Sequence, residues 1–218
     1  MKNTKKLATC AVLVALATAL AIVSMIIPLQ LPYGGSVTLA SMLPIVVAAY
    51  MYGPGWGLGT AFVFSVIQMV LGGKTVMAFF MPGDSRMIWY KALLVCVIDY
   101  ILAYTVIGFA GIFSKKIKNP SLSLCAGSAF ALILRYICHI VSGAIFFGTW
   151  AEGFFADWGP FVGTAFGKWV VGNISGTSLS WFYSVVYNGL YMIPEIIITS
   201  VCAFVVAKVL KKYIVVSY

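Results

Sequence analysis

One stretch of the chain reads Arg135-Tyr-Ile-Cys-His139-Ile-Val-Ser142-Gly143-Ala-Ile-Phe146-Phe147-Gly148, and it lies in an apolar run that begins near Leu122. As a helix, this stretch places Arg135, His139, Ser142, Gly143 and Phe146 on one face, because they recur at i, i+4, i+7, i+8 and i+11. His139 is the only histidine of the chain. A cation and an imidazole inside a membrane are costly, so these residues either form a functional site or are a costly accident of the sequence.

The composition around this stretch is that of a membrane protein. Of the 218 residues, 62% are hydrophobic and 9% are charged, and the mean hydropathy is +1.05. A soluble domain has about a quarter of its residues charged. In lipid, every backbone polar group needs an internal partner, so runs of this length must be helical. The sequence predicts an all-α, polytopic membrane protein in which residues 1–218 form a single integral-membrane domain.

Six transmembrane helices are predicted from the apolar runs and the turns between them. They cover about Leu7–Ile27, Val37–Tyr52, Trp56–Leu71, Ile88–Phe113, Leu122–Gly148 and Trp181–Leu210. With both termini inside, nine lysines lie on the inner side and four basic residues on the outer side, which favours an N-in, C-in topology. The loop of residues 149–180 then faces outward, either as a cover over a pocket or as an interfacial aromatic belt.

The first span has no small-residue cleavage site before Pro28, so we interpret it as an uncleaved helix rather than a signal peptide. Ala11, Ala15 and Ala19 recur every fourth residue, and Ala17 and Ala21 repeat this spacing on an adjoining face. Small residues at this spacing let helices approach closely. The pattern fits docking onto a partner membrane protein or packing within this bundle, and the spacing alone does not separate the two.

The fourth predicted span carries Asp99 near its middle, with Tyr100 and Tyr104 beside it. A carboxylate at this depth needs a partner, either Arg135, a group on the last span, or the charge of a cationic substrate. His139 is either a lone core histidine or part of a site, and its neighbours Ser142, Gly143, Phe146 and Phe147 favour a site. There we expect Gly143 to leave room for a ligand ring on which the phenylalanines stack.

The last predicted span brings further polar groups to the membrane. Tyr183, Tyr187 and Tyr191 form one stripe, and Asn188, Tyr191 and Glu195 form another. Tyr183 and Asn188 lie about 140° apart on a straight helix, so both face one ligand only if Tyr183 lies at the start of the helix. Glu195 lies deeper, where a structural or coupling role suits it better than substrate contact.

Several functions are not supported by any motif. The net charge of +9 comes from clusters of lysines that flank apolar runs, which indicates topology rather than nucleic-acid binding. The five cysteines show no metal-ligand spacing, so no metal site and no cofactor are predicted. The segment Gly163-Thr-Ala-Phe-Gly167-Lys168-Trp169 departs from a phosphate-binding loop in both its spacing and its last residue. The sequence contains no Ser-His-Asp group that would suggest an enzyme.

The chain resembles the thiamine-specific S-components of energy-coupling factor (ECF) transporters. Five segments carry the resemblance: Tyr33-Gly-Gly-Ser-Val-Thr-Leu, Tyr52-Gly-Pro-Gly-Trp-Gly, Asp99-Tyr-Ile-Leu-Ala-Tyr with Gly108-Phe-Ala-Gly-Ile-Phe113, Arg135-Tyr-Ile-Cys-His139 through Phe147-Gly148, and Tyr183-Ser-Val-Val-Tyr-Asn188 through Pro194-Glu195. Together they extend over nearly all of the predicted spans.

This resemblance implies a six-helix bundle in the bacterial plasma membrane that binds thiamine near its outer side. It also implies docking, through the alanine pattern of the first span, onto a module of one transmembrane subunit and two ATPases. The substrate-binding residues it implies are Asp99, Tyr100, His139, Tyr183, Asn188 and Tyr33, together with the phenylalanine and glycine at Phe147 and Gly143.

The sequence departs from the family pattern at three of these positions. Asp99 stands where some members have glutamate, and Tyr33 and Phe147 stand where tryptophans occur. Because tyrosine and phenylalanine attract a cation less strongly than tryptophan does, the stacking contacts differ from those of the family. Three other readings stay open: an S-component for another vitamin or precursor, a transporter coupled to protons through Asp99, His139 and Glu195, and a membrane enzyme.

Overall fold

The computed structural model describes residues 2–26 and 35–217, and within them the regular structure is helical. The elements in chain order are α1 (Lys2–Ile26), α2 (Leu43–Leu71), α3 (Gly73–Phe80), α4 (Trp89–Val95), η2 (Cys96–Leu102), α5 (Ala103–Thr105), η3 (Val106–Phe113), α6 (Pro120–Phe146), η4 (Gly148–Trp150), α7 (Ala151–Gly153), η5 (Phe154–Trp158), α8 (Ala165–Asn173) and α9 (Gly176–Val209).

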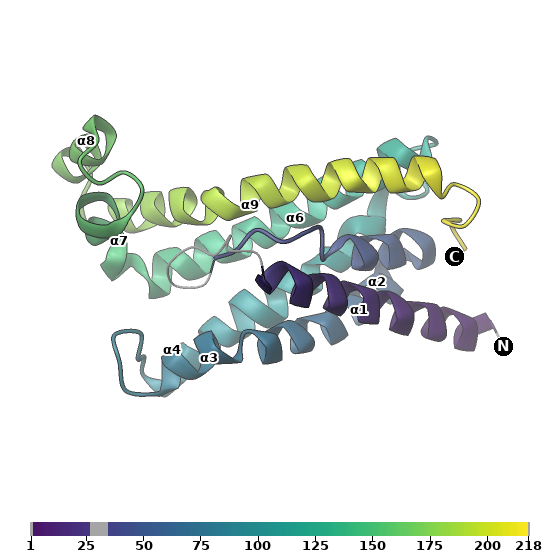
Figure 1. Ribbon diagram of the computed structural model, residues 1–218, viewed down its shortest axis with the longest axis horizontal. Coiled ribbons are helices and arrows are strands. Elements are labelled where there is room, and N and C mark those ends of the chain that lie inside the picture. Colours follow the sequence, from purple (N-terminus) through teal and green to yellow (C-terminus); the bar gives the residue numbers. More distant parts are fainter. Residues whose placement is uncertain (1, 27–34, 218) are drawn as a thin grey trace.

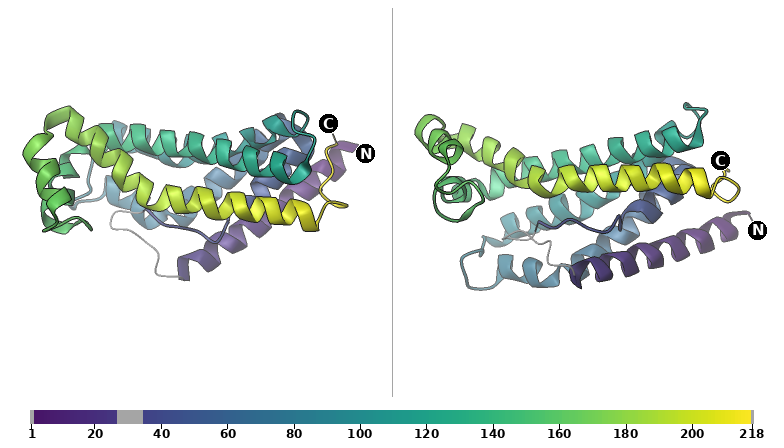
Figure 2. Two further views of the ribbon diagram at one scale, coloured as in Figure 1. Left: turned by 90° about the horizontal axis from the view of Figure 1, so that it is seen from above. Right: turned by 45° about the horizontal axis from the view of Figure 1, so that its top comes forward.

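Five helices in the described part of the chain are long and apolar enough to cross a membrane. They are residues Asn3–Ile26, Leu43–Leu71, Trp89–Phe113, Pro120–Phe146 and Gly176–Val209. The long helices lie lengthwise in one elongated bundle, with both termini at one end and α3, α4, α7 and α8 at the other (Figure 1). Figure 2 shows α6 and α9 side by side from two further directions.

The second helix differs from the prediction at its start and in its middle. We expected a span from Val37, but the helix begins at Leu43, because Pro44 fits the first turn of a helix, where its missing N–H costs nothing. At Gly53 the backbone has a φ of 85°, and the chain turns there. A side chain on Gly57 would lie 2.6 Å from Cβ of Ala49, a distance that no continuous helix allows for residues eight apart.

The predicted span Ile88–Phe113 is helical from Trp89, but its winding changes along its length. An α-helical start passes into the π-helical turn η2, which carries Asp99 and Tyr100, and ends in the 3₁₀-helix η3. A wide π turn inside a helix often occurs at a functional site because it rotates side chains relative to regular α geometry. Here it lies where two predicted site residues follow each other.

The last helix begins earlier than predicted, and the long loop before it is largely helical. Helix α9 starts at Gly176 instead of Trp181, and η4, α7, η5 and α8 fill most of residues 149–175. Phe154 and Phe155 are both 1% exposed and pack against neighbouring rings, including Phe161 and Tyr183. This small aromatic core attaches the segment to the start of α9.

The two alanine faces of α1 have different environments. Ala17 and Ala21 are buried against the bundle, with exposed fractions of 0% and 5%. Ala11, Ala15 and Ala19 are exposed. Packing within the bundle therefore accounts for the second face and leaves the first one uncovered.

Close contact between α2 and η3 depends on glycine. A side chain on Gly108 would lie 2.3 Å from the backbone nitrogen of Leu58, and backbone atoms cannot move aside as a flexible side chain can. We expect Gly108→Ala to lower the free energy of unfolding by about 1–3 kcal/mol. Thermal unfolding in detergent measures this loss. Gly59→Ala is the matched control, because its side chain would meet nothing within 4 Å; an equal loss in both variants would contradict the close contact.

Candidate functional site

A cavity opens between α6, α9, η2 and the segment that follows α1. Its volume is about 130 Å³, roughly ten times the space that one water molecule needs. The lining residues are Gly35, Ser36, Thr38, Thr75, Phe79, Asp99, Tyr100, Tyr104, Arg135, His139, Gly143, Phe147, Trp150, Tyr183, Tyr187, Asn188 and Tyr191. Aromatic rings and a few polar groups of both charges thus surround one space, which is typical of a small-molecule site.

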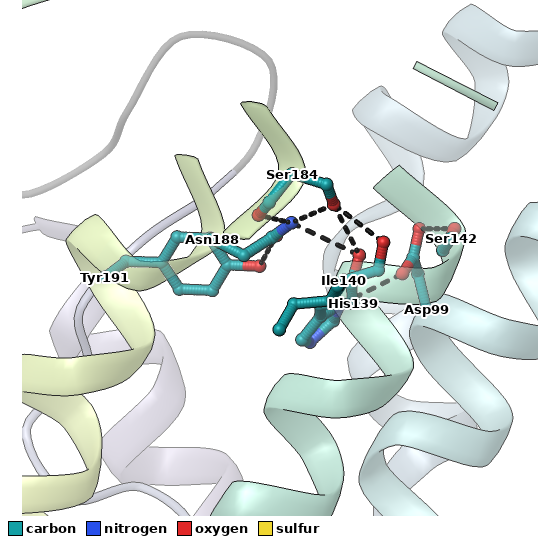
Figure 3. A network of polar contacts seen from close by, with 7 residues as sticks. All are labelled: Asp99, His139, Ile140, Ser142, Ser184, Asn188 and Tyr191. Atoms are coloured by element: carbon teal, nitrogen blue, oxygen red, sulfur yellow. Dashed lines mark hydrogen bonds and ion pairs between the residues drawn. The ribbon is translucent and has the colours of Figure 1, made fainter. Parts of the chain in front are cut away.

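Asp99 is held by two side chains of α6. Nδ1 of His139 lies 2.9 Å from Oδ1 of Asp99, and the Ser142 hydroxyl donates to Oδ2 at 2.7 Å (Figure 3). Because an ionised carboxylate only accepts, Nδ1 of His139 carries the proton in this pair. Each carboxylate oxygen keeps a further lone pair. Nε2 of His139 is buried and has no hydrogen-bond partner among the described residues, and the imidazole as a whole lines the cavity.

Asn188 organises the facing side of the cavity. Its amide nitrogen donates to the Ser184 backbone oxygen at 2.8 Å and to the His139 backbone oxygen at 3.2 Å. Its amide oxygen accepts from the Tyr191 hydroxyl at 2.6 Å (Figure 3). These bonds connect α9 to α6 and fix the orientation of the amide, so Asn188 supports the site, and its contact with a substrate stays a prediction.

Gly143 makes this connection possible. A side chain there would lie 2.2 Å from the Ser184 hydroxyl oxygen and 3.0 Å from Nδ2 of Asn188. We expected the gap at Gly143 to admit a ligand ring. The structure shows that α9 fills the gap on that side, although Gly143 still contributes to the cavity wall.

Arg135 does not pair with Asp99. Its guanidinium carbon lies 4.1 Å from the centre of the Tyr104 ring, and its Nη1 donates to the sulfur of Met42 at 2.7 Å. The only ion pair within 4.0 Å among the described residues is that of His139 with Asp99. The aromatic face of Tyr104 therefore stabilises this buried cation, and its Nε lacks a partner among the described residues.

Aromatic side chains form the rest of the wall. Phe147 lies between Phe79 and Trp150, with ring centres 5.9 Å and 5.4 Å away. On α9, the rings of Tyr183 and Tyr187 are 5.5 Å apart. Such surfaces suit a flat ring or a cation.

Seven of the residues predicted from the sequence lie around this one cavity, although their part in binding stays a prediction. They are Asp99, Tyr100, His139, Gly143, Phe147, Tyr183 and Asn188. Tyr33 lies outside the described residues. Phe146 does not line the cavity and packs with Phe79 and Val95 instead. Tyr183 lies two turns inside α9 rather than at its start, and both Tyr183 and Asn188 line the cavity.

Sequence reasoning missed other parts of the lining. Thr75 and Phe79 come from α3, a short helix in a region that we interpreted as a loop. Its apolar residues at Val76, Phe79 and Phe80 have helical spacing, which is the signal that could have revealed it. The described residues contain no group of three or more His, Cys, Asp or Glu side chains that could hold a metal ion.

Comparisons with known proteins agree with this picture. Residues 7–158 match the family described as thiamine transporter protein. The chain is 28% identical to the thiamine transporter ThiT of Bacillus subtilis over 209 residues, which are 92% of this chain and 88% of the relative. A solved structure of ThiT from Listeria monocytogenes has the same fold, with a TM-score of 0.67 and 20% identity, and covers 99% of this chain and 100% of its own.

The family match covers well over half of the chain, and the membrane-length helices agree with it. The protein is a multi-pass protein of the bacterial plasma membrane. The similarity to thiamine transport proteins inferred from the sequence is confirmed, and the chain belongs to the thiamine transporter protein family.

Proposed function

We propose that this protein is the thiamine-binding membrane subunit of an ECF-type vitamin importer. It captures thiamine at the extracellular side and docks on a module of one transmembrane coupling subunit and two ATPases. The observation that carries this proposal is the cavity, in which the Asp99–His139 pair faces aromatic rings within a chain of the thiamine transporter protein family.

Thiamine has a permanent thiazolium charge and a flat aminopyrimidine ring, and the cavity offers a group for each. The negative charge of the Asp99 carboxylate offsets the thiazolium cation, or its oxygens accept a hydrogen bond from the exocyclic amine. The rings of Phe147, Trp150 and Tyr183 provide faces for stacking and for the cation. We assign substrate contact also to His139, Tyr100, Gly143 and Tyr33, and support of the site to Asn188.

We infer an N-in, C-in topology with six transmembrane segments, counting the two parts of α2 on either side of Gly53. Both termini lie at one end of the bundle (Figure 1), as an even number of crossings requires. This end holds the lysines at residues 2–6 and 208–212, which favours the cytoplasm. Residues 1–218 act as a single integral-membrane domain without catalytic activity of its own.

The uncovered face of α1 supports the docking part of the proposal. Ala11, Ala15 and Ala19 present a flat strip of exposed small residues along the helix, and such strips let two helices approach closely in lipid. Ala17 and Ala21 already serve the contact with the bundle. The first strip is therefore the one we assign to the coupling subunit.

A proton-coupled transporter is the alternative from another class. Its relay needs Asp99, His139 and Glu195 to exchange protons, but the Glu195 carboxyl group accepts from Thr38 and Thr199 and does not line the cavity. Uptake by vesicles that contain this chain alone, driven by a pH gradient, would support that alternative.

Tryptophan fluorescence tests the proposed substrate. We expect thiamine to quench the fluorescence of the purified protein saturably at sub-micromolar concentration, because Trp150 lines the cavity. A neutral pyrimidine and riboflavin serve as comparison ligands. In Trp150→Phe most of the signal change should disappear, whereas Trp169→Phe, an exposed residue outside the cavity, should keep it. Saturable binding of a comparison ligand without a response to thiamine would transfer the proposal to another vitamin.

A further inference from the structure

One wall of the cavity is not helical. Gly35, Ser36 and Thr38 line the cavity, and residues 35–39 that contain them are not helical, with Ser36 in an isolated β-bridge. Within a membrane-spanning bundle, irregular backbone persists where protein groups satisfy its polar atoms or where it lines a water-filled cavity. The partners of this segment therefore decide whether the wall exists in a defined position.

The principal partner is Glu195 of α9. The backbone N–H of Thr38 donates to Oε2 of Glu195 at 2.5 Å, and the Thr38 hydroxyl donates to Oε1 at 2.7 Å. The same Oε1 accepts from Thr199 at 3.1 Å. Glu195 is 1% exposed and does not line the cavity, so its carboxyl group is occupied by the segment rather than by a ligand.

Two further contacts fix the ends of this wall. The Leu39 N–H donates to the Ser24 hydroxyl near the end of α1 at 2.8 Å. At the other end, a side chain on Gly35 would lie 2.6 Å from Cδ1 of Tyr191, so the backbone rests directly on that ring. Ala40, which directly follows the segment of residues 35–39, has a φ of 51°, a strained value for a residue with a side chain.

We propose that Glu195 is a positioning residue of the binding site, which holds residues 35–39 in place as a wall of the cavity through its two bonds to Thr38. This inference rests on the proposed function and adds a role for a buried carboxyl group that does not touch the substrate. Thiamine enters a cavity whose wall is already placed, and the bonds to Glu195 slow the departure of the bound ligand.

Stopped-flow fluorescence on the purified full chain gives the association and dissociation rates of thiamine. We expect Glu195→Ala to raise the dissociation rate about tenfold to a hundredfold, because the carboxyl group that accepts two bonds from Thr38 is lost. Glu195→Gln should lie between Glu195→Ala and the wild type, since the amide can still accept from the Thr38 N–H. Thr199→Val is the matched control: it removes a bond to the same carboxyl group without touching the segment, and its rates should equal those of the wild type.

The double variant separates positioning from general damage to the fold. Thr38→Val removes the hydroxyl bond, so Glu195→Ala combined with Thr38→Val should be less severe than the sum of the single effects. Additive effects, or wild-type dissociation from folded Glu195→Ala and Glu195→Gln, would overturn the proposal. Thermal unfolding of each variant identifies the folded preparations.

Hydrogen exchange keeps this test independent of the substrate. Without any ligand, the amide of Thr38 should exchange faster in Glu195→Ala than in the wild type, whereas Thr199→Val should leave it unchanged. If wild-type protein does not bind thiamine, the proposed function fails and the exchange result still decides the role of Glu195. Equal exchange at Thr38 in the wild type and Glu195→Ala would exclude that role.

Discussion

Asp99→Asn is expected to keep the fold and to weaken thiamine binding by about 1–3 kcal/mol, which corresponds to roughly a 5- to 150-fold increase in the dissociation constant. The reason is that Asp99 supplies the only carboxylate among the described residues that line the cavity. Asparagine has nearly the same size but only one accepting oxygen, so it cannot serve His139, Ser142 and a ligand together.

The size of this effect depends on the network around Asp99. His139 and Ser142 already occupy one lone pair on each carboxylate oxygen at 2.9 Å and 2.7 Å. With asparagine, the amide NH₂ faces either the Ser142 hydroxyl, which must then accept instead of donate, or Nδ1 of His139, which then loses its acceptor and shifts the imidazole that lines the cavity. The substitution therefore removes the negative charge of Asp99 and also disturbs its hydrogen bond to Ser142 or to the His139 imidazole.

Isothermal titration calorimetry of detergent-solubilised protein measures the change. Asp84→Asn is the matched control, because Asp84 is an exposed carboxylate that does not line the cavity, and the same charge is removed. We expect wild-type affinity in that control. If Asp99→Asn bound thiamine as tightly as the wild type, Asp99 would have no part in binding.

The membrane helices and the central polar residues of the site could be predicted from the sequence. Runs such as Pro120–Phe146 are long and apolar because a membrane requires it, so length and composition reveal them. Asp99 and His139 stood out because polar groups in such runs are costly. The structure places Oδ1 of Asp99 2.9 Å from Nδ1 of His139. A polar residue within an apolar run can be recognised from the sequence alone.

The parts that could not be predicted depend on contacts between distant segments. The segment before α2 contains no pattern that shows it stays extended, because its partner, Glu195, lies 157 residues away from Thr38. Likewise, the guanidinium of Arg135 stacks on the ring of Tyr104 and does not pair with Asp99, the partner that the sequence suggested. The spacing at Gly143 indicated a gap but not that Ser184 fills it.

The change with the largest expected effect on transport is Ala15→Leu in α1. Ala15 lies at the centre of the exposed alanine face, where added bulk points away from the described part of the bundle. We expect thiamine binding and thermal stability to equal those of the wild type. Uptake should fall to background, because a leucine holds apart two helices that must approach closely.

Uptake of labelled thiamine by cells that also produce the coupling subunit and both ATPases measures this effect, with fluorescence titration as the binding assay. Ala165→Leu makes the same change at an exposed alanine of α8, at the opposite end of the bundle from the termini (Figure 1), and should leave uptake intact. Loss of uptake in Ala15→Leu alone, with binding preserved, separates docking from substrate capture. Wild-type uptake in Ala15→Leu would remove α1 as the docking face and leave the cavity assignment unaffected, because Ala15 does not line the cavity.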